Sequence, residues 1–277
     1  MAIEIEKPQP LMLGDKAHYT LSSYDPVNVT VQVQRVTDED VEMTLAAVLA
    51  HSGATPENLS DSAWMAENFD GVTSMDEVRE IVREEVEDMF AQMTEEQKVT
   101  NAIEALAERL QQSVPPSILA RYRKGVELNF VEGLADEGAS LEDFLLQSGL
   151  TRSAFNAMMD KQAKKAAEED AALDAYAREK KLSVTEAEFG SLLGFPESEM
   201  SEIIQEVKAA GEYDSLKETA LHTKAVHCLV SEASCNYEHE TEEHARLRAQ
   251  QMAEMRANFT AALADDEEDA GSGFELV

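Results

Sequence analysis

The chain has 277 residues, and its 56 acidic side chains outnumber its 23 basic ones to give a formal net charge of -33 at pH 7. A field of this sign repels phosphate backbones and argues against direct binding of DNA or RNA. It favours high solubility, or partners that are basic or unfolded, although adaptation to high salt produces the same excess of acid.

The composition also restricts the fold class. A hydrophobic fraction of 43% is ordinary for a protein that buries a core. The 12 glycines and 7 prolines are few for this length, and the abundant Ala, Glu, Leu and Met favour helices. The N-terminus lacks a basic region followed by an apolar one, and no run approaches the roughly 18 apolar residues that span a bilayer. We therefore expect a mainly helical, cytoplasmic protein with no membrane partner.

The strand signals lie near the N-terminus. Residues 27–36 alternate valines with polar side chains, which is the period of a half-buried strand. Ile3 and Ile5 indicate a shorter strand before Pro8. The sequence therefore predicts a small N-terminal β element.

A helix is predicted to begin at Thr37-Asp38-Glu39-Asp40, because acidic side chains favour the positive end of a helix dipole. A linker is predicted at 52–62, followed by the apolar group Trp64, Met65 and Phe69.

Ser74 and Glu77 have the spacing of a capping box, and an apolar stripe follows as far as Leu110. Thr94 and Gln97 have the same spacing, so a break at that point stays open. An unbroken helix over 75–113 would be about 57 Å long, which suggests a spine or a protruding structure.

Further helices are predicted after Pro115-Pro116, because proline is tolerated in a first helical turn. Apolar spacings and capping residues place them at 115–137, 140–149, 151–181, 185–194, 195–211, 212–230 and 239–264. The helix at 75–113 is paired with 115–137, and the helix at 151–181 with the segment that follows it, because such pairs can project as arms. The acidic composition of the tail at 265–277 predicts disorder.

One region is rich in histidine and cysteine, so the spacings of these residues bear on metal binding. Its residues are His222, His227, Cys228, Cys235, His239 and His244. A spacing of five turns His244 about 140° away from His239 on a helix, so one ion cannot easily hold both. No glycine-rich phosphate loop and no nucleophile with an orienting base is recognisable in the sequence. We expect no metal, no cofactor and no enzymatic activity, and a metal-dependent enzyme is the third alternative.

Several segments resemble trigger factor, a bacterial chaperone for nascent chains, in the same order along the chain. They are Leu11–Asp15, Arg35–Val41, Pro56–Val82, Ser113–Leu119, Ser140–Phe144 and Leu182–Glu188. Each motif is short, and the resemblance covers about residues 8–230. It implies the C-terminal body of that family, with two helical arms and an apolar cradle for unfolded or partly folded clients.

Two parts of the family are not recognisable in the sequence, so the resemblance does not extend to their activities. These parts are the glycine-phenylalanine ribosome-docking signature and the prolyl isomerase domain. Ribosome binding is therefore not expected.

The predicted function is ATP-independent holding of unfolded or nascent polypeptides. The client-binding residues are predicted on arm helices: Met89, Phe90, Met93, Phe130, Phe155, Met158 and Met159. The alternative function is a scaffold for one basic folded partner. The domain prediction is an N-terminal β segment at 1–36, a helical chaperone body with arms at 37–264 and an acidic tail at 265–277.

Overall fold

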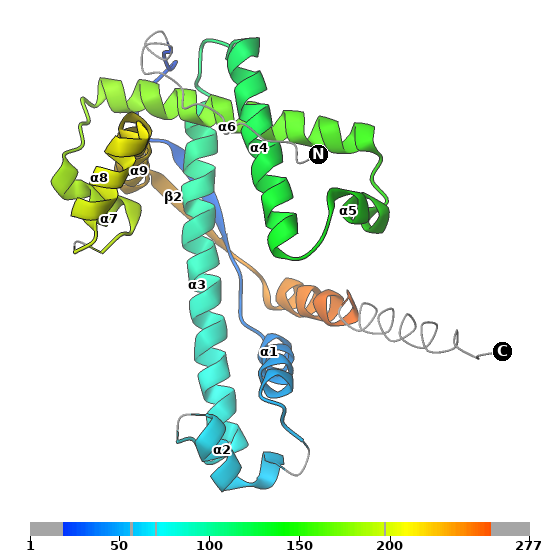
Figure 1. Ribbon diagram of the computed structural model, residues 1–277. Helices are drawn as coiled ribbons and strands as arrows, with labels where there is room; N and C mark the ends of the chain where they lie inside the picture. Colours follow the sequence, from blue (N-terminus) through cyan, green and yellow to red (C-terminus); the bar gives the residue numbers. More distant parts are fainter. Residues whose placement is uncertain (1–18, 56–57, 70, 197, 256–277) are drawn as a thin grey trace. The chain divides into compact units, whose positions relative to one another are not determined.

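The computed structural model describes residues 19–55, 58–69, 71–196 and 198–255 (Figure 1). The chain forms two compact units: unit 1 contains the residues up to Val29 and Val99–Cys235, and unit 2 contains Thr30–Lys98 and the residues from Asn236 onward. Each unit is therefore built from segments far apart in the sequence. The predicted strand at Ile3 and Ile5 and the predicted tail at 265–277 lie outside the described residues. The division at 36 and 264 stays a prediction.

Helices dominate both units, and the predicted mainly α fold with a small β element is confirmed. The elements are β1 (Asn28–Val33), α1 (Asp38–His51), α2 (Ser62–Asn68), α3 (Met75–Ala107), α4 (Pro116–Asp136), α5 (Leu141–Ser148), α6 (Arg152–Glu179), α7 (Phe189–Leu193), α8 (Met200–Ala210), α9 (Tyr213–Glu232) and β2 (Ser234–His239). Short 3-10 turns lie at Asn58–Ser60 and Glu186–Glu188, and residues 242–255 are helical.

Strand β1 follows the predicted alternation. Val29 and Val31 are buried, whereas Asn28 before them and Thr30 between them are exposed. A period of two places successive side chains on opposite faces, so one face of β1 contributes to the core.

Strand β2 is the partner of β1, and the sequence analysis missed it. The amide of Ser234 donates to the carbonyl of Val27 at 2.8 Å, and the amide of Glu240 donates to the carbonyl of Val33 at 2.9 Å. Both residue numbers rise together along these bonds, so the two strands are parallel. The side chains of β2 are mostly exposed and polar, which removes the hydrophobic alternation that would have predicted a strand.

The core of unit 2 lies between α1 and the first half of α3. Val41 and Leu45 of α1 are buried against Val78, Val82 and Val86 of α3. The predicted apolar stripe of α3 meets the apolar face of α1 in this cluster. The apolar side chains form a continuous stripe because residues three and four apart lie on one helical face.

Helix α3 continues through Thr94 and Gln97, where the sequence left a break open. The Thr94 hydroxyl donates to the carbonyl of Phe90 at 2.8 Å, so it bonds inside the helix and does not cap a new one. The Gln97 side chain accepts from the amide of Gln32 in β1 at 2.6 Å. Both polar groups thus have partners that leave the helical hydrogen bonds intact.

Arg248, on the helix at 242–255, joins four segments of unit 2. Its guanidinium donates to both carboxylate oxygens of Asp40, at 3.0 and 3.2 Å. It also donates to Glu240 at 3.2 Å and to the carbonyl of Arg35 at 2.9 Å. The guanidinium carbon lies 5.1 Å from the ring centroid of Phe90 in α3. The planar fork of arginine suits this mixture of bidentate and stacking contacts.

Asp40 also begins α1, because it forms a capping box with Thr37. The Asp40 amide donates to the Thr37 hydroxyl at 3.1 Å, and the Thr37 amide donates back to the carboxylate at 3.0 Å. Burial opposes ionisation of this carboxyl, but hydrogen bonds from Arg248 and Thr37 outweigh burial and lower the pKa of Asp40.

Unit 1 is organised around α6. Figure 1 shows α4 crossing α6, and these two helices form the most extensive helix contact of the described chain. The Tyr122 hydroxyl donates to Asp170, and the Arg123 side chain donates to Asp160 at 2.9 Å. The predicted pairing of this helix with the preceding long helix stays a prediction, whereas two of its polar side chains bind α6.

Helix α6 also contacts α9, and α9 contacts α7 and α8. Small side chains dominate the buried positions of α6: Ala163, Ala167, Ala171, Ala172, Ala175 and Ala177. Side chains of this size allow neighbouring helices to approach α6 closely.

We expect Arg248→Gln to lower the free energy of unfolding of unit 2 by about 3 kcal/mol, because it leaves the Asp40 carboxylate buried without its main partner. Urea unfolding followed by fluorescence measures this, since Trp64 is the single tryptophan of the chain and lies in unit 2. The control Arg83→Gln removes an exposed ion pair with Asp38 and should change stability much less. Recovery of stability in the double variant Asp40→Asn/Arg248→Gln would confirm the coupling, and equal effects of the Arg83 and Arg248 variants would contradict it.

The lowered pKa of Asp40 predicts a loss of stability in acid. Its contribution is fully present above its ordinary pKa of about 4 and is lost as the pH falls through the lower folded-state pKa. Between pH 7 and pH 3 the wild type should therefore lose more unfolding free energy than Asp40→Asn, as measured by urea titrations of Trp64 fluorescence. Parallel pH profiles of the two proteins would contradict this assignment.

Candidate functional site

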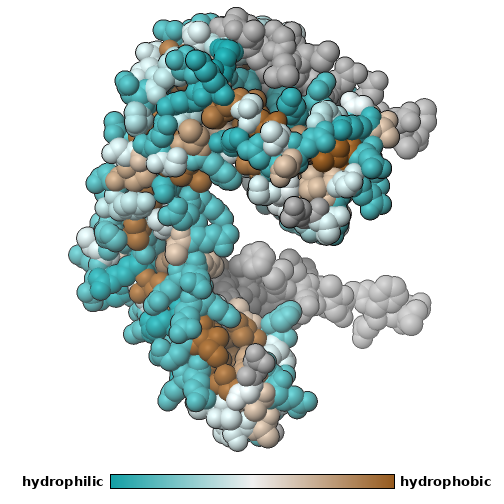
Figure 2. Space-filling view, turned by 90° about the vertical axis from the view of Figure 1, so that its left-hand side faces the viewer, coloured by the Kyte–Doolittle hydropathy of each residue, from teal (hydrophilic) through white to brown (hydrophobic). Residues whose placement is uncertain are grey.

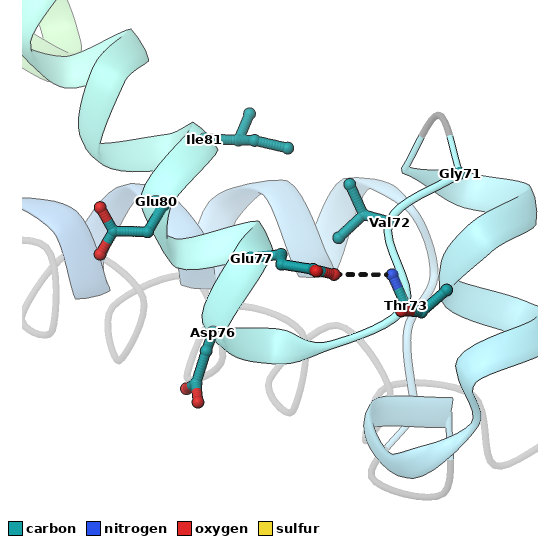
Figure 3. A pocket seen from close by; sticks show the side chains of 7 residues that line it. All are labelled: Gly71, Val72, Thr73, Asp76, Glu77, Glu80 and Ile81. Atoms are coloured by element: carbon teal, nitrogen blue, oxygen red, sulfur yellow. Dashed lines mark hydrogen bonds between the residues drawn. The ribbon is translucent and has the colours of Figure 1, made fainter.

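A surface pocket of about 600 Å³ opens in unit 2 beside the first turns of α3. Its lining residues are Gly71, Val72, Thr73, Asp76, Glu77, Glu80 and Ile81. Figure 3 shows the side chains of Val72 and Ile81 on the same side of α3, whereas Glu80 and Asp76 point away from them. The pocket thus combines an apolar side with an acidic one.

The turn between α2 and α3 gives the pocket its shape. Gly71 has a φ of +89°, a left-handed conformation that glycine adopts without steric cost. Val72 follows this turn and packs partly against the core cluster of unit 2. The turn therefore places Val72 opposite Ile81, which is 41% exposed.

The predicted cap of α3 is present at the edge of the pocket. The Glu77 amide donates to the Ser74 hydroxyl at 3.3 Å, and the Thr73 amide donates to the Glu77 carboxylate at 3.1 Å (Figure 3). The hydrogen bond from the Thr73 amide, followed by one from the Ser74 side chain, lowers the pKa of the Glu77 carboxyl. Glu77 therefore stays ionised, and the pocket keeps a negative rim.

The predicted client-binding residues of unit 2 divide into exposed and buried side chains. Met89 and Met93 are 47% and 46% exposed on α3. Phe90 between them is buried in the core cluster and lies beneath Arg248. Ile81, which the sequence assigned only to the apolar stripe, lies on the surface at the edge of that stripe.

The predicted residues of unit 1 are partly or fully buried. Phe130 is half-buried, and its ring centroid lies 5.0 Å from Phe144 and 5.4 Å from Phe155. Phe155 and Met159 are fully buried, and Met158 is half-buried. Burial gives Phe155 and Met159 a packing role in this structure.

Leu146 of α5 is an exposed apolar residue that the sequence analysis did not select, at 83% exposure. Figure 2 shows that hydrophobic surface on one face occurs as separate patches within a largely hydrophilic surface.

The histidine- and cysteine-rich region does not form one cluster. His227, His239 and His244 are exposed, and both cysteines are free thiols. His222 alone turns inward. This histidine instead meets Asp170 and Asp174 of α6, a pairing that residues 222–244 by themselves did not suggest.

The His222 ring lies between two carboxylates. Its Nε2 is 2.8 Å from Asp174, and its Nδ1 is 3.4 Å from Asp170. Burial acts to lower the pKa of His222, but bonding to both carboxylates outweighs it and raises that pKa to about 9.

A match to a family model identifies the protein family to which these helices belong. The model of the bacterial trigger factor protein C-terminus matches residues 74–231, which is more than half of the chain. The chain belongs to the trigger factor C-terminus family. The match begins at the cap of α3 and continues into α9, so it contains the long helix and all of α4 to α8.

Individual trigger factors match about half of the chain. The trigger factors of Mycobacterium ulcerans and Mycobacterium marinum are each 28% identical over 146 residues, or 52% of this chain and 29% of theirs. The trigger factor of Alkaliphilus metalliredigens is 23% identical over 151 residues, or 53% of this chain and 35% of its own. The matched region thus spans about a third of these relatives.

Among solved structures, the crystal structure of a hypothetical Mycoplasma protein is similar at a TM-score of 0.39 and 12% identity, covering 80% of this chain and 95% of that one.

In the described part of the chain, no helix is both long enough and apolar enough to cross a bilayer.

Proposed function

We propose that the protein is an ATP-independent chaperone that holds unfolded, partly folded or nascent polypeptides on exposed apolar side chains. Membership of the trigger factor C-terminus family supports a chaperone-related function. The observation that carries the proposal is the exposure of Ile81, Met89 and Met93 on α3, each by more than two-fifths. Exposed apolar groups on a water-soluble surface are sites where a partner gains free energy by covering them.

The chemistry of these side chains suits varied clients. Methionine is unbranched and polarizable, so it adapts its shape to different partners. Ile81 and Val72 form the apolar side of a pocket large enough to accept a client side chain. Adaptable methionines beside an apolar pocket favour the binding of many different client sequences over the binding of one partner with a complementary surface.

The acidic surroundings have two consequences for binding. Asp76, Glu77 and Glu80 line the pocket beside its apolar side chains. Negative charge attracts basic client segments over several ångströms, and the net charge of -33 keeps a complex with an unfolded chain in solution.

The alternative function, a scaffold for one basic folded partner, uses the same charge but a different interface. A stable specific interface buries about 1,200–2,000 Å² in total, with a continuous apolar centre. Separate apolar patches, as Figure 2 shows on one face, favour short client segments instead. Binding of several unrelated unfolded proteins supports the chaperone, and a single stoichiometric basic partner supports the scaffold.

The triple variant Ile81→Ser/Met89→Ser/Met93→Ser should suppress aggregation of a chemically unfolded model protein less than the wild type does. Covering one of these partly exposed side chains contributes about 1 kcal/mol, so losing three removes about 3 kcal/mol and should weaken client affinity about 100-fold. Light scattering after dilution from denaturant, without nucleotide, measures the effect.

Two further variants control this experiment. Gln92→Ser changes a polar, exposed position on the same helix and should leave the activity unchanged. Leu146→Ser removes the exposed side chain of α5 and tests whether unit 1 contributes. A wild type that does not reduce scattering at several-fold molar excess would exclude the chaperone, and full activity of the triple variant would exclude α3 as its surface.

The protein should not bind ribosomes. Ribosomal RNA presents phosphates, and affinity for them depends on basic side chains that displace counterions. A net charge of -33 adds repulsion, which is strongest at low salt because the Debye length grows from about 10 Å at 0.1 M to about 30 Å at 0.01 M. Co-sedimentation with ribosomes over this salt range is the measurement, and a bound fraction that decreases as salt rises would contradict the expectation.

A further inference from the structure

Three side chains of unit 1 converge where α6 packs against α9. Asp174 comes from α6, and Glu218 and His222 come from α9. A spacing of four places Glu218 and His222 on the same helical face. One nitrogen or oxygen of each residue lies within 4.8 Å of the others.

The histidine ring is held in one orientation by a fourth side chain. Nε2 of His222 faces Asp174 at 2.8 Å, and Nδ1 on the other side of the ring lies 3.4 Å from Asp170. Asp170 itself accepts a hydrogen bond from the hydroxyl of Tyr122 in α4. A metal-bound histidine nearly always directs its second nitrogen to a carboxylate or carbonyl, which fixes the ring. Asp170 has this position relative to His222.

We propose that Asp174, Glu218 and His222 bind a divalent transition-metal ion, with Zn²⁺ the best match to the donor set. The ion lies between Nε2 of His222 and the two carboxylates, where it replaces the proton that Nε2 directs to Asp174, and that proton leaves to solvent. Zinc takes nitrogen and oxygen ligands at about 2.0–2.2 Å, so two ligands of a tetrahedral ion lie about 3.4 Å apart. The present separation of Nε2 and Asp174 therefore opens by a few tenths of an ångström when the ion enters.

The donor types select the class of metal. An imidazole nitrogen with two carboxylates suits zinc and its transition-metal neighbours, whereas calcium and magnesium take oxygen ligands alone. Asp174 is 7% exposed, and Glu218 is half-buried, so the site is shielded on one side and open to a water ligand on the other.

The bound ion joins α6 to α9 directly and reaches α4 through Asp170 and Tyr122. Its role is structural, and it is independent of the chaperone activity proposed for α3. The inference rests on side-chain positions in unit 1 alone.

Calorimetric titration of the full chain with Zn²⁺, after treatment with EDTA and removal of the chelator, tests the site. We expect one ion per chain and a higher melting temperature of unit 1. Glu218→Gln and His222→Gln should each lose more affinity than Asp170→Asn, for which the loss of an orienting partner predicts about 10–100-fold. His227→Gln, an exposed histidine on the same helix, is the matched control and should bind as the wild type does.

A spectroscopic measurement separates ligation from a change in folding. The imidazole nitrogen-15 signal of His222 Nε2 should shift on addition of Zn²⁺ in the wild type and in His227→Gln. Far-UV circular dichroism shows whether each variant is folded, and Glu218→Gln, at a partly exposed position, carries the test if the buried position does not tolerate Asp174→Asn. Failure of the wild type to bind micromolar Zn²⁺ would overturn the proposal, as would binding that survives His222→Gln but is lost in His227→Gln or His239→Gln.

Discussion

A buried carboxylate must be compensated where it lies, and this requirement organises both units of a chain whose net charge is -33. Among the described residues, Asp40 and Asp174 are the charged side chains that the structure buries. Asp40 meets Arg248, which lies 208 residues further along the chain, and Asp174 meets His222, 48 residues away. Each pair joins segments that are remote in the sequence. Removing either partner leaves a charge in a place where water cannot solvate it, so the packing around it depends on the pair.

The other acidic side chains have a different consequence, because most of them lie on the surface. They allow Ile81, Met89 and Met93 to remain exposed, since repulsion between like-charged molecules opposes association through these side chains. The core cluster of unit 2 lies beneath the same helix, where Val78, Val82 and Val86 are buried. Helix α3 thus has one apolar stripe whose centre stabilises unit 2 and whose edges are exposed.

Local patterns in the sequence were sufficient for most of the helices. The acidic run after Thr37 predicted the start of a helix without information from outside the segment, and α1 begins there. The course of α3 past Thr94 was not predictable, because Gln97 bonds to β1 and a local pattern does not contain that partner. Strand β2 was missed for the same reason: its polar side chains give no period, and only pairing with β1 makes it a strand.

The candidate site was predictable only to the level of a helix stripe. Periodicity placed Met89, Phe90 and Met93 together, but a stripe has a centre and two edges, and the neighbouring helix decides which is covered. Phe90 is the centre because α1 and Arg248 cover it, and the two methionines are edges. In unit 1 the aromatic contacts of Phe130 depend on α5 and α6 meeting at the same place, which no spacing within one helix specifies.

The two buried carboxylates could not be recognised from the sequence either, because no single acidic residue stands out among 56. Their partners also differ in chemistry: arginine is permanently charged and binds no metal, whereas the ring nitrogen of His222 is a common metal ligand with Glu218 beside it. The two buried carboxylates therefore differ in the partners that can compensate them: Asp40 has a permanent cation, whereas Asp174 has a ring nitrogen that can also bind a metal.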